Sequence, residues 1–177
     1  MRADDTMIAE TAHCGPRPLY TPEQRRRRDA TRWTLVQGIL APVQFLIFLV
    51  SLGLVLRFLL TGEGAFAATV SIVVKTIALY AIMVTGSIWE KVVFDRWLFA
   101  PAFFWEDVFS MLVLALHGAY LVALVADLGT ERGRMLLALA AYATYVVNAA
   151  QFLWKLRVAR LQGGPTERLA VVGAVTG

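Results

Sequence analysis

Four long apolar runs dominate the pattern of hydrophobic and polar positions along the chain. They cover residues 33–56, 64–89, 97–126 and 135–154, and the first and last contain no charged residue. A helix needs about 20 apolar residues to cross a bilayer, and each run reaches that length. The pattern therefore predicts four membrane-spanning helices, at about 35–60, 66–89, 99–126 and 135–155.

The expected connections between these helices are short. They are Gly62-Glu63-Gly64, Glu90 to Arg96, and Asp127 to Arg134. Short connections make consecutive helices antiparallel neighbours. A soluble four-helix bundle would need a polar stripe on every helix, which the first and last runs lack. The predicted fold class is all-α, an integral membrane four-helix bundle with up-down antiparallel topology.

A further helix is expected before the first span. Thr21-Pro22-Glu23-Gln24 combines an N-cap threonine, a proline at the first helical position and a glutamine at the capping-box position. Pro42 lies inside the first run and is expected either to kink that helix or to mark where the juxtamembrane helix gives way to it. Gly163-Gly164-Pro165 is expected to end the last helix. The predicted organisation is a flexible tail over 1–20, a membrane domain over 21–161 and a second flexible tail over 162–177.

Composition agrees with a membrane protein. The 177 residues are 58% hydrophobic and 17% charged, and the mean hydropathy is +0.62. Such values exclude disorder for the bulk of the chain, and collagen-like or disulfide-rich classes as well. The single cysteine, Cys14, cannot form an internal disulfide. The N-terminus lacks the short apolar segment of a cleavable signal peptide, so the first span is expected to direct insertion.

The distribution of positive charge predicts the orientation. Of the 17 Lys and Arg residues, seven precede the first span, two lie in the second connection and four follow the last span, against three on the opposite side. The positive-inside rule then places both termini in the cytoplasm, and all five tryptophans lie near the same side. The run Arg25 to Arg28 is interpreted as a contact with anionic lipid rather than with nucleic acid.

Polar residues inside the spans are the candidate functional groups, because ionisable side chains in a membrane usually face the bundle interior. Glu106, Ser110 and His117 lie nearly on one helical face, and Tyr120 follows. The last span has a matching stripe. Its members are Tyr145, Asn148, Gln151 and Lys155. The second span presents a similar row made of Lys75, Leu79, Met83, Gly86 and Glu90.

Each of these residues also has a structural explanation, as an ion pair, an interhelical hydrogen bond or a helix end. As a set, two acids, a base and a lysine in three helices favour a polar site within the bundle. Two histidines and one cysteine leave too few ligands for a structural zinc, so no metal site is expected. The chemistry that these residues still allow is acid–base catalysis by carboxyl groups and histidine on an apolar substrate.

Several segments resemble one known family. Trp89-Glu90-Lys91-Val92-Val93-Phe94 and the aromatic stretch from Leu98 to Phe109, with Phe-Ala-Pro-Ala-Phe-Phe-Trp-Glu-Asp-Val-Phe at its centre, are similar to the 3-vinyl bacteriochlorophyllide hydratases of photosynthetic bacteria. The segments Leu19 to Glu23, Trp33 to Pro42 and Asn148 to Leu156 are similar too. The resemblance covers about Leu19 to Leu161.

The resemblance implies an enzyme of bacteriochlorophyll synthesis, a hydro-lyase. It would add water across the C3-vinyl group of a chlorophyllide and give a 1-hydroxyethyl group. No cofactor is expected, and magnesium enters only as part of the pigment. The implied location is the bacterial inner, intracytoplasmic membrane, with both termini cytoplasmic.

Protonation of the terminal vinyl carbon leaves a cation next to the macrocycle, and water attacks there, so the enzyme needs an acid and a positioned water. Glu106 is expected to be the acid, kept protonated by the flanking rings of Phe103, Phe104 and Trp105. Asp107, Glu90 or His117 would orient the water, or His117 would bind the pigment's magnesium; the sequence leaves this open. The residues expected to contact substrate are Lys75, Phe104, Trp105, Asn148 and Gln151.

Other functions remain to be distinguished. A pigment-binding chaperone or assembly scaffold would need the aromatic slot but not both acids. A small transporter would need polar groups through the full thickness, whereas the acids cluster on one side. Expected partners are the tetrapyrrole, water and lipid, with no nucleic acid. Whether neighbouring pathway enzymes or a second copy of the chain also bind is left open.

Overall fold

The computed structural model describes the backbone of residues 19–175 and the side chains of residues 19–158. Within that part, the chain forms five helices and no strand. The tail expected over 1–20 lies outside the described residues except for Leu19 and Tyr20. Tyr20 is buried against Phe94 and Phe103, so the packed body begins before residue 21, earlier than expected.

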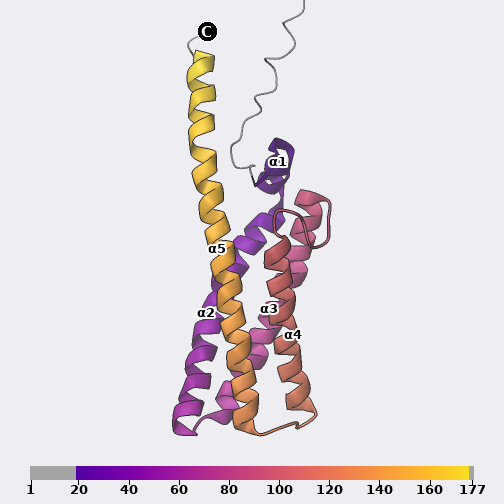
Figure 1. Ribbon diagram of the computed structural model, residues 1–177, viewed down its shortest axis with the longest axis vertical. Coiled ribbons are helices and arrows are strands. Elements are labelled where there is room, and N and C mark those ends of the chain that lie inside the picture. Colours follow the sequence, from indigo (N-terminus) through magenta and orange to yellow (C-terminus); the bar gives the residue numbers. More distant parts are fainter. Residues whose placement is uncertain (1–18, 176–177) are drawn as a thin grey trace, which may run out of the picture.

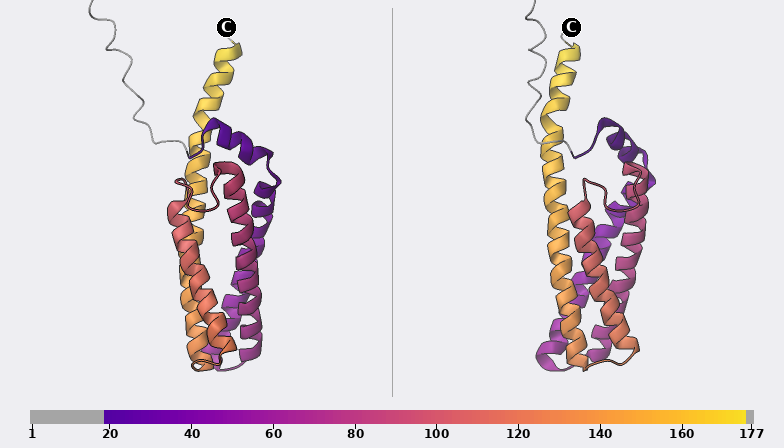
Figure 2. Two further views of the ribbon diagram at one scale, coloured as in Figure 1. Left: turned by 90° about the vertical axis from the view of Figure 1, so that its right-hand side faces the viewer. Right: turned by 45° about the vertical axis from the view of Figure 1, so that its right-hand side comes forward.

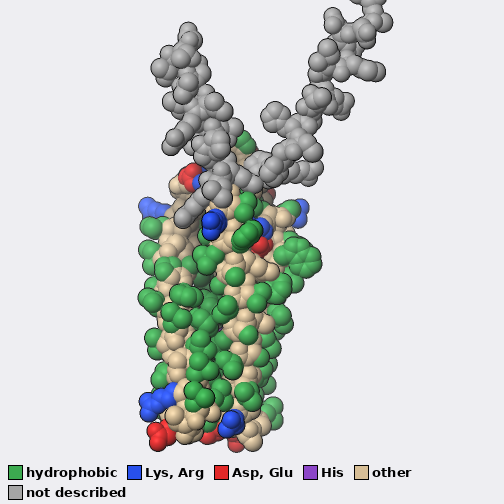
Figure 3. Space-filling view, turned by 60° about the vertical axis from the view of Figure 1, so that its left-hand side comes forward, with side chains coloured by type: hydrophobic (Ala, Val, Ile, Leu, Met, Phe, Trp, Pro, Cys, Tyr) green, Lys and Arg blue, Asp and Glu red, His purple; other side chains and the backbone are tan. Residues whose placement is uncertain are grey.

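Four of the helices are long and apolar enough to cross a membrane. They are α2 (Arg32–Thr61), α3 (Ala65–Phe94), α4 (Phe104–Val125) and α5 (Glu131–Val175). In Figure 1 the chain descends through α2, returns through α3, descends through α4 and returns through α5. Figure 3 shows hydrophobic side chains over the middle of the face in view, with charged side chains at its two ends. The predicted all-α fold with four helices able to span a membrane is confirmed.

The short helix α1 (Pro22–Ala30) lies across one end of this bundle (Figure 2), which is called the α1 end below. Its capping box forms as predicted: the Gln24 N–H donates to Thr21 Oγ1, and the Thr21 N–H donates to Gln24 Oε1. Thr31 has an extended conformation and separates α1 from α2. The junction therefore lies at Thr31, and Pro42 sits inside a continuous α2, so the proline does not mark it.

The opposite end contains two tight turns. Gly62 and Gly64 adopt φ of +77° and +85°, a left-handed conformation that glycine reaches without steric cost. The turn brings α2 and α3 into extensive contact, and α4 and α5 form the other closely packed pair. Ser51 on α2 ties three helices together, because its hydroxyl lies 2.7 Å from Ser71 Oγ and 2.6 Å from Tyr142 Oη.

Two helix boundaries differ from the predictions. The third span begins at Phe104 rather than 99, because Pro101 restricts Ala100 to extended conformations and the helix starts only after the proline. The last helix continues to Val175, past Gly163-Gly164-Pro165. Glycine and proline weaken a helix, and proline removes one of its hydrogen bonds, but neither obliges it to end.

Candidate active site

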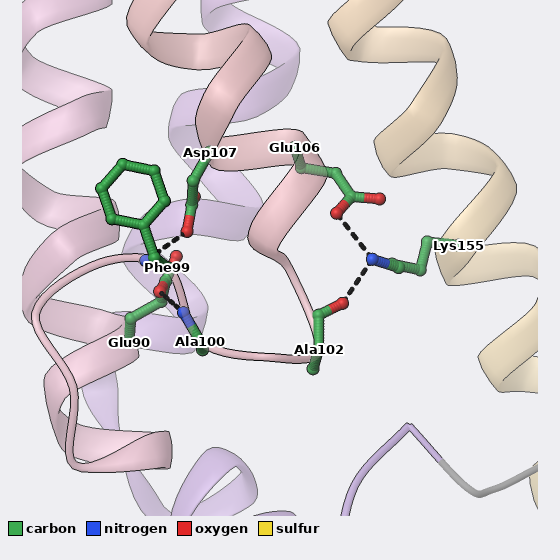
Figure 4. Close-up of polar contacts among 7 residues, drawn as sticks. All are labelled: Glu90, Phe99, Ala100, Ala102, Glu106, Asp107 and Lys155. Carbon is green, nitrogen blue, oxygen red and sulfur yellow. Dashed lines mark hydrogen bonds and ion pairs between the residues drawn. The ribbon is translucent and has the colours of Figure 1, made fainter.

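Two buried carboxyl groups from different spans meet at the α1 end. Glu90 lies one turn before the end of α3, and Asp107 lies in the first turn of α4. Their carboxyl groups contact each other, as Figure 4 shows. Glu90 is 6% exposed and Asp107 is 3% exposed. The pair is therefore almost fully buried inside the protein. The two residues are 17 positions apart in the sequence.

The loop 95–103 between α3 and α4 holds this pair in place. The Phe99 N–H donates to Asp107 Oδ2 at 2.7 Å, and the next N–H, of Ala100, donates to Glu90 Oε2 at 3.3 Å. Each carboxyl group thus has one oxygen engaged by the backbone. Phe99 has φ of +58°, which is unfavourable for a bulky residue and costs about 1–3 kcal/mol. The surrounding contacts keep the loop in a strained conformation that presents two consecutive donors.

Glu106 takes part in a different contact. Its Oε2 accepts a hydrogen bond from Lys155 Nζ on α5 at 2.6 Å, and Lys155 also donates to the carbonyl oxygen of Ala102 (Figure 4). The ammonium lies 5.1 Å from the centre of the buried Phe103 ring. The side chains of Glu106 and Lys155 thus form an ion pair at the α1 end of the bundle. Glu106 links α4 to α5.

The ring-lined setting expected for Glu106 is only partly present. Phe103 is buried, but Phe104 and Trp105 are 45% and 65% exposed. Phe104 and Trp105 precede Glu106 by two positions and by one, and at about 100° per residue they lie on other sides of α4. The expectation was wrong for those two rings. They form an exposed row with Phe99 instead, with ring centres 5.7 Å and 5.6 Å apart.

The other predicted site residues lie deeper in the bundle. Lys75, His117 and Asn148 are buried, and Gln151 is partly buried. His117 is ten residues from Asp107 on α4, or about 15 Å along the axis. Lys75 is 15 residues from Glu90, or about 22 Å. The structure therefore separates the predicted set into a carboxyl site at the α1 end and a second polar group in the interior.

The predicted polar stripes of the third and fourth spans face each other. Glu106, Ser110, His117 and Tyr120 are all buried on α4. Asn148 Nδ2 on α5 donates to Ser110 Oγ at 2.8 Å, and Lys155 contacts Glu106. These contacts confirm that the two stripes are partners.

Some participants were not identified from the sequence. Lys155 was placed on the α5 stripe but not assigned to the site, although its position one turn after Gln151 was the available signal. The backbone donors of Phe99 and Ala100 gave no signal beyond the Ala-Pro pair, because a backbone N–H is present in nearly every residue. Among the described residues, no three His, Cys, Asp or Glu side chains are grouped so that they could hold a metal ion.

Comparison with known proteins gives this arrangement a context. The family model described as 2-vinyl bacteriochlorophyllide hydratase matches residues 20–158. The chain belongs to this family. The predicted family, named for a 3-vinyl group, is the same one, since the two names differ only in wording.

Two proteins named 2-vinyl bacteriochlorophyllide hydratase are closely similar. The one from Cereibacter sphaeroides is 72% identical over 146 residues, which cover 82% of this chain and 90% of the relative. The one from Rhodobacter capsulatus is 70% identical over 144 residues, which cover 81% of this chain and 84% of the relative. No solved structure matches the chain. The part of this chain that matches the hydratase family contains Glu90, Asp107 and the loop between them.

Proposed function

We propose that this chain is a hydratase that adds water to the vinyl group of a bacteriochlorophyllide and forms a 1-hydroxyethyl group. The relatives named for this reaction are at least 70% identical over most of both chains. The observation that supports the chemistry is the contact between the Glu90 and Asp107 carboxyl groups beneath the loop 95–103. Hydration of an alkene needs one group that gives a proton and one that accepts a proton, and a pair of carboxyl groups offers both.

Two carboxylates in contact repel each other, so the pair is most stable when it shares one proton. In the proposed reaction the protonated member transfers this proton to the terminal carbon of the vinyl group. The positive charge then lies on the carbon bonded to the macrocycle, which delocalises it. Water adds its oxygen to that carbon and gives a proton to the carboxylate pair. The pair ends the cycle with the single proton it began with.

This assignment moves the proton donor from Glu106 to the Glu90–Asp107 pair. Glu106 becomes a positioning residue, because its ion pair with Lys155 holds α5 against the start of α4. Lys155 also binds Ala102 in the loop that covers the carboxyl groups. Glu106 as the donor remains the competing assignment, and the variants described in the Discussion distinguish the two.

We place the pigment against the exposed row of rings formed by Phe99, Phe104 and Trp105. A flat macrocycle partitions into the bilayer, and aromatic rings stack favourably on such a surface. The row adjoins the site, since Phe99 carries the N–H that binds Asp107. The carboxyl groups are covered, so the loop 95–103 has to move before the vinyl group can reach them.

The remaining parts of the proposal concern location and partners. We propose that the chain lies in the bacterial inner membrane with both termini in the cytoplasm, as the distribution of Lys and Arg favours. The reaction is proposed to need no cofactor, because water and a proton are its only other reactants. The magnesium of the pigment belongs to the substrate. His117 is not assigned to it, because its side chain is 1% exposed.

The test uses the full chain in detergent or nanodiscs with a vinyl bacteriochlorophyllide. The expected result is a blue shift of the pigment's absorption, because hydration removes the vinyl group from conjugation. In water labelled with heavy oxygen, the product should gain one labelled hydroxyl group. Tight pigment binding with no shift and no label would instead indicate a chaperone or scaffold.

A further inference from the structure

The interior of the bundle contains buried polar atoms that have no hydrogen-bond partner among the described residues. An isolated buried polar group is destabilising, so proteins rarely leave one unsatisfied. Several such atoms lie along one part of the bundle interior. They are Gln44 Nε2 and Oε1, Lys75 Nζ, His117 Nε2, Asn148 Oδ1 and Gln151 Oε1.

These atoms come from all four spanning helices and gather around one stretch of α5. Lys75 Nζ on α3 lies 3.9 Å from the centre of the Tyr145 ring. The centre of the His117 ring on α4 lies 5.8 Å from the centre of the Tyr142 ring. The centre of the Phe48 ring on α2 lies 4.9 Å from that of Tyr145, and Gln44 is one turn before Phe48 toward the α1 end.

The same stretch of α5 continues to Asn148 and Gln151, which lie one and two turns beyond Tyr145. The group formed by Gln44, Lys75, His117, Asn148 and Gln151 is called the interior polar cluster below. Gln44, Lys75, His117 and Asn148 are each at least nine-tenths buried.

The donors and acceptors of this cluster complement each other. His117 Nδ1 lies 2.8 Å from the Val113 carbonyl oxygen, so Nδ1 carries a hydrogen, and in the neutral ring Nε2 presents a lone pair. Asn148 Nδ2 donates to Ser110, which leaves its Oδ1 as an acceptor. Lys75 and the Gln44 amide supply N–H groups. A water molecule both donates and accepts, so it can bridge such groups where they do not reach each other.

Lys75 gives the strongest indication. Its amino group is completely buried in the middle of a span, and no carboxylate is among its contacts in the described residues. Burying a polar group without a hydrogen-bond partner is costly, and more so if the group is charged. The Tyr145 ring face lies against this amino group, and hydrogen bonds to water would satisfy its N–H groups.

We propose that the interior polar cluster is a binding site for ordered water and that this water supplies the carboxyl site. The stripe on α5 continues from Asn148 through Gln151 to Lys155, a rise of about 10 Å. Lys155 contacts Glu106, the neighbour of Asp107. When the pigment covers the carboxyl pair from the lipid side, water reaches the pair from inside the bundle. The supply step rests on the proposed hydratase function; the water site does not.

The water site can be tested without measuring activity. Brief X-ray irradiation converts bound water into hydroxyl radicals, which oxidise the side chains next to it. Phe48 and Phe45 form a matched pair on α2, with rings 5.9 Å apart, one buried beside the cluster and the other facing outward. We expect Phe48 and Tyr145 to be oxidised several-fold faster than Phe45. Equal or slower oxidation of Phe48 and Tyr145 would overturn the water site.

Variants connect the water to the reaction. Gln44→Leu removes two polar atoms of the cluster, and Lys75→Met provides a second variant in case one does not insert. Both should reduce the oxidation of Tyr145 and lower kcat for hydration, while pigment affinity stays unchanged. Gln37→Leu is the control, because Gln37 is on the same helix but donates to Thr85, outside the cluster. Gln37→Leu should change neither the oxidation of Tyr145 nor kcat.

The possible results separate the two parts of the proposal. Oxidation that falls in Gln44→Leu without any loss of kcat would overturn the supply step and leave the water site standing. Rapid oxidation of Tyr145 in a wild-type chain that does not hydrate the pigment would reject the hydratase function, and with it the supply step, but not the water site.

Discussion

Lys155 on α5 donates to Glu106 on α4 with Nζ 2.6 Å from Oε2, so the acid singled out by the sequence is held in an ion pair. The neighbouring Asp107 points the other way, toward Glu90 on α3 (Figure 4). Two adjacent acids on one helix therefore serve two different interfaces, because successive side chains on a helix point about 100° apart. This difference leads to separate expectations for the two residues.

Replacement of either member of the carboxyl pair should abolish most of the activity. Glu90→Gln and Asp107→Asn keep the shape of the side chain but remove the proton that the pair shares. Loss of general acid–base help should lower kcat about 100-fold or more while pigment binding persists. Single-turnover measurements with the vinyl pigment would show this. Wild-type turnover in both variants would show that the pair is structural.

Glu106→Gln should mainly affect stability. The substitution leaves the Lys155 ammonium partly buried without its carboxylate, which should cost about 1–3 kcal/mol in the free energy of unfolding. The double variant Glu106→Gln, Lys155→Met removes both charges and should recover part of this loss. Denaturation in detergent would measure both changes. If Glu106→Gln keeps its stability but loses activity about as completely as Asp107→Asn, Glu106 is the proton donor.

Trp105→Leu should weaken pigment binding if the exposed row of rings holds the macrocycle. Loss of the indole stacking surface should raise the pigment Kd roughly fivefold, corresponding to about 1 kcal/mol. Phe66→Leu is the matched control, because Phe66 is an exposed ring near the opposite end of the bundle. Fluorescence titration of the pigment would compare the two. Equal affinity in the wild type and Trp105→Leu would place the pigment elsewhere.

The two ends of the bundle should lie on opposite sides of the membrane. Reporter fusions after Arg160 are expected to be cytoplasmic, and reporters in the connection 126–130 are expected to be external. This follows from the excess of Lys and Arg on the side that carries α1. An external reporter after Arg160 would reverse the orientation and place the carboxyl site away from the cytoplasm.

Packing of α1 should depend on pH at the alkaline end. Burial raises the pKa of Tyr20 above its ordinary value of 10.0, and the nearby Arg28 guanidinium partly offsets this. A group whose folded pKa is raised stabilises the fold fully below its unfolded pKa, and this contribution is lost as pH rises through the folded pKa. The phenolate absorbance of the wild type minus that of Tyr20→Phe should therefore titrate above pH 10. Titration at the ordinary value would show that Tyr20 is not packed in solution.

Much of the architecture could be predicted from local sequence. The four spans follow from the length of their apolar runs, and the start of α1 follows from Thr21, Pro22 and Gln24, because both signals act within one helix. The polar faces of α4 and α5 follow from helical periodicity. The predicted start of α4 was too early, because the loop before this helix is also apolar and extends the hydrophobic run.

What the sequence determined by itself is therefore the set of helices, the faces that turn inward and the family to which the chain belongs. Only the tertiary structure decided which acid meets which partner. Glu90 and Asp107 come together because the loop 95–103 folds back over both, and Glu106 meets Lys155 because α4 and α5 pack side by side. Periodicity gives the direction of a side chain relative to its own helix. The partner depends on the rotation and height of the neighbouring helices, which are set by the packing of all four spans together.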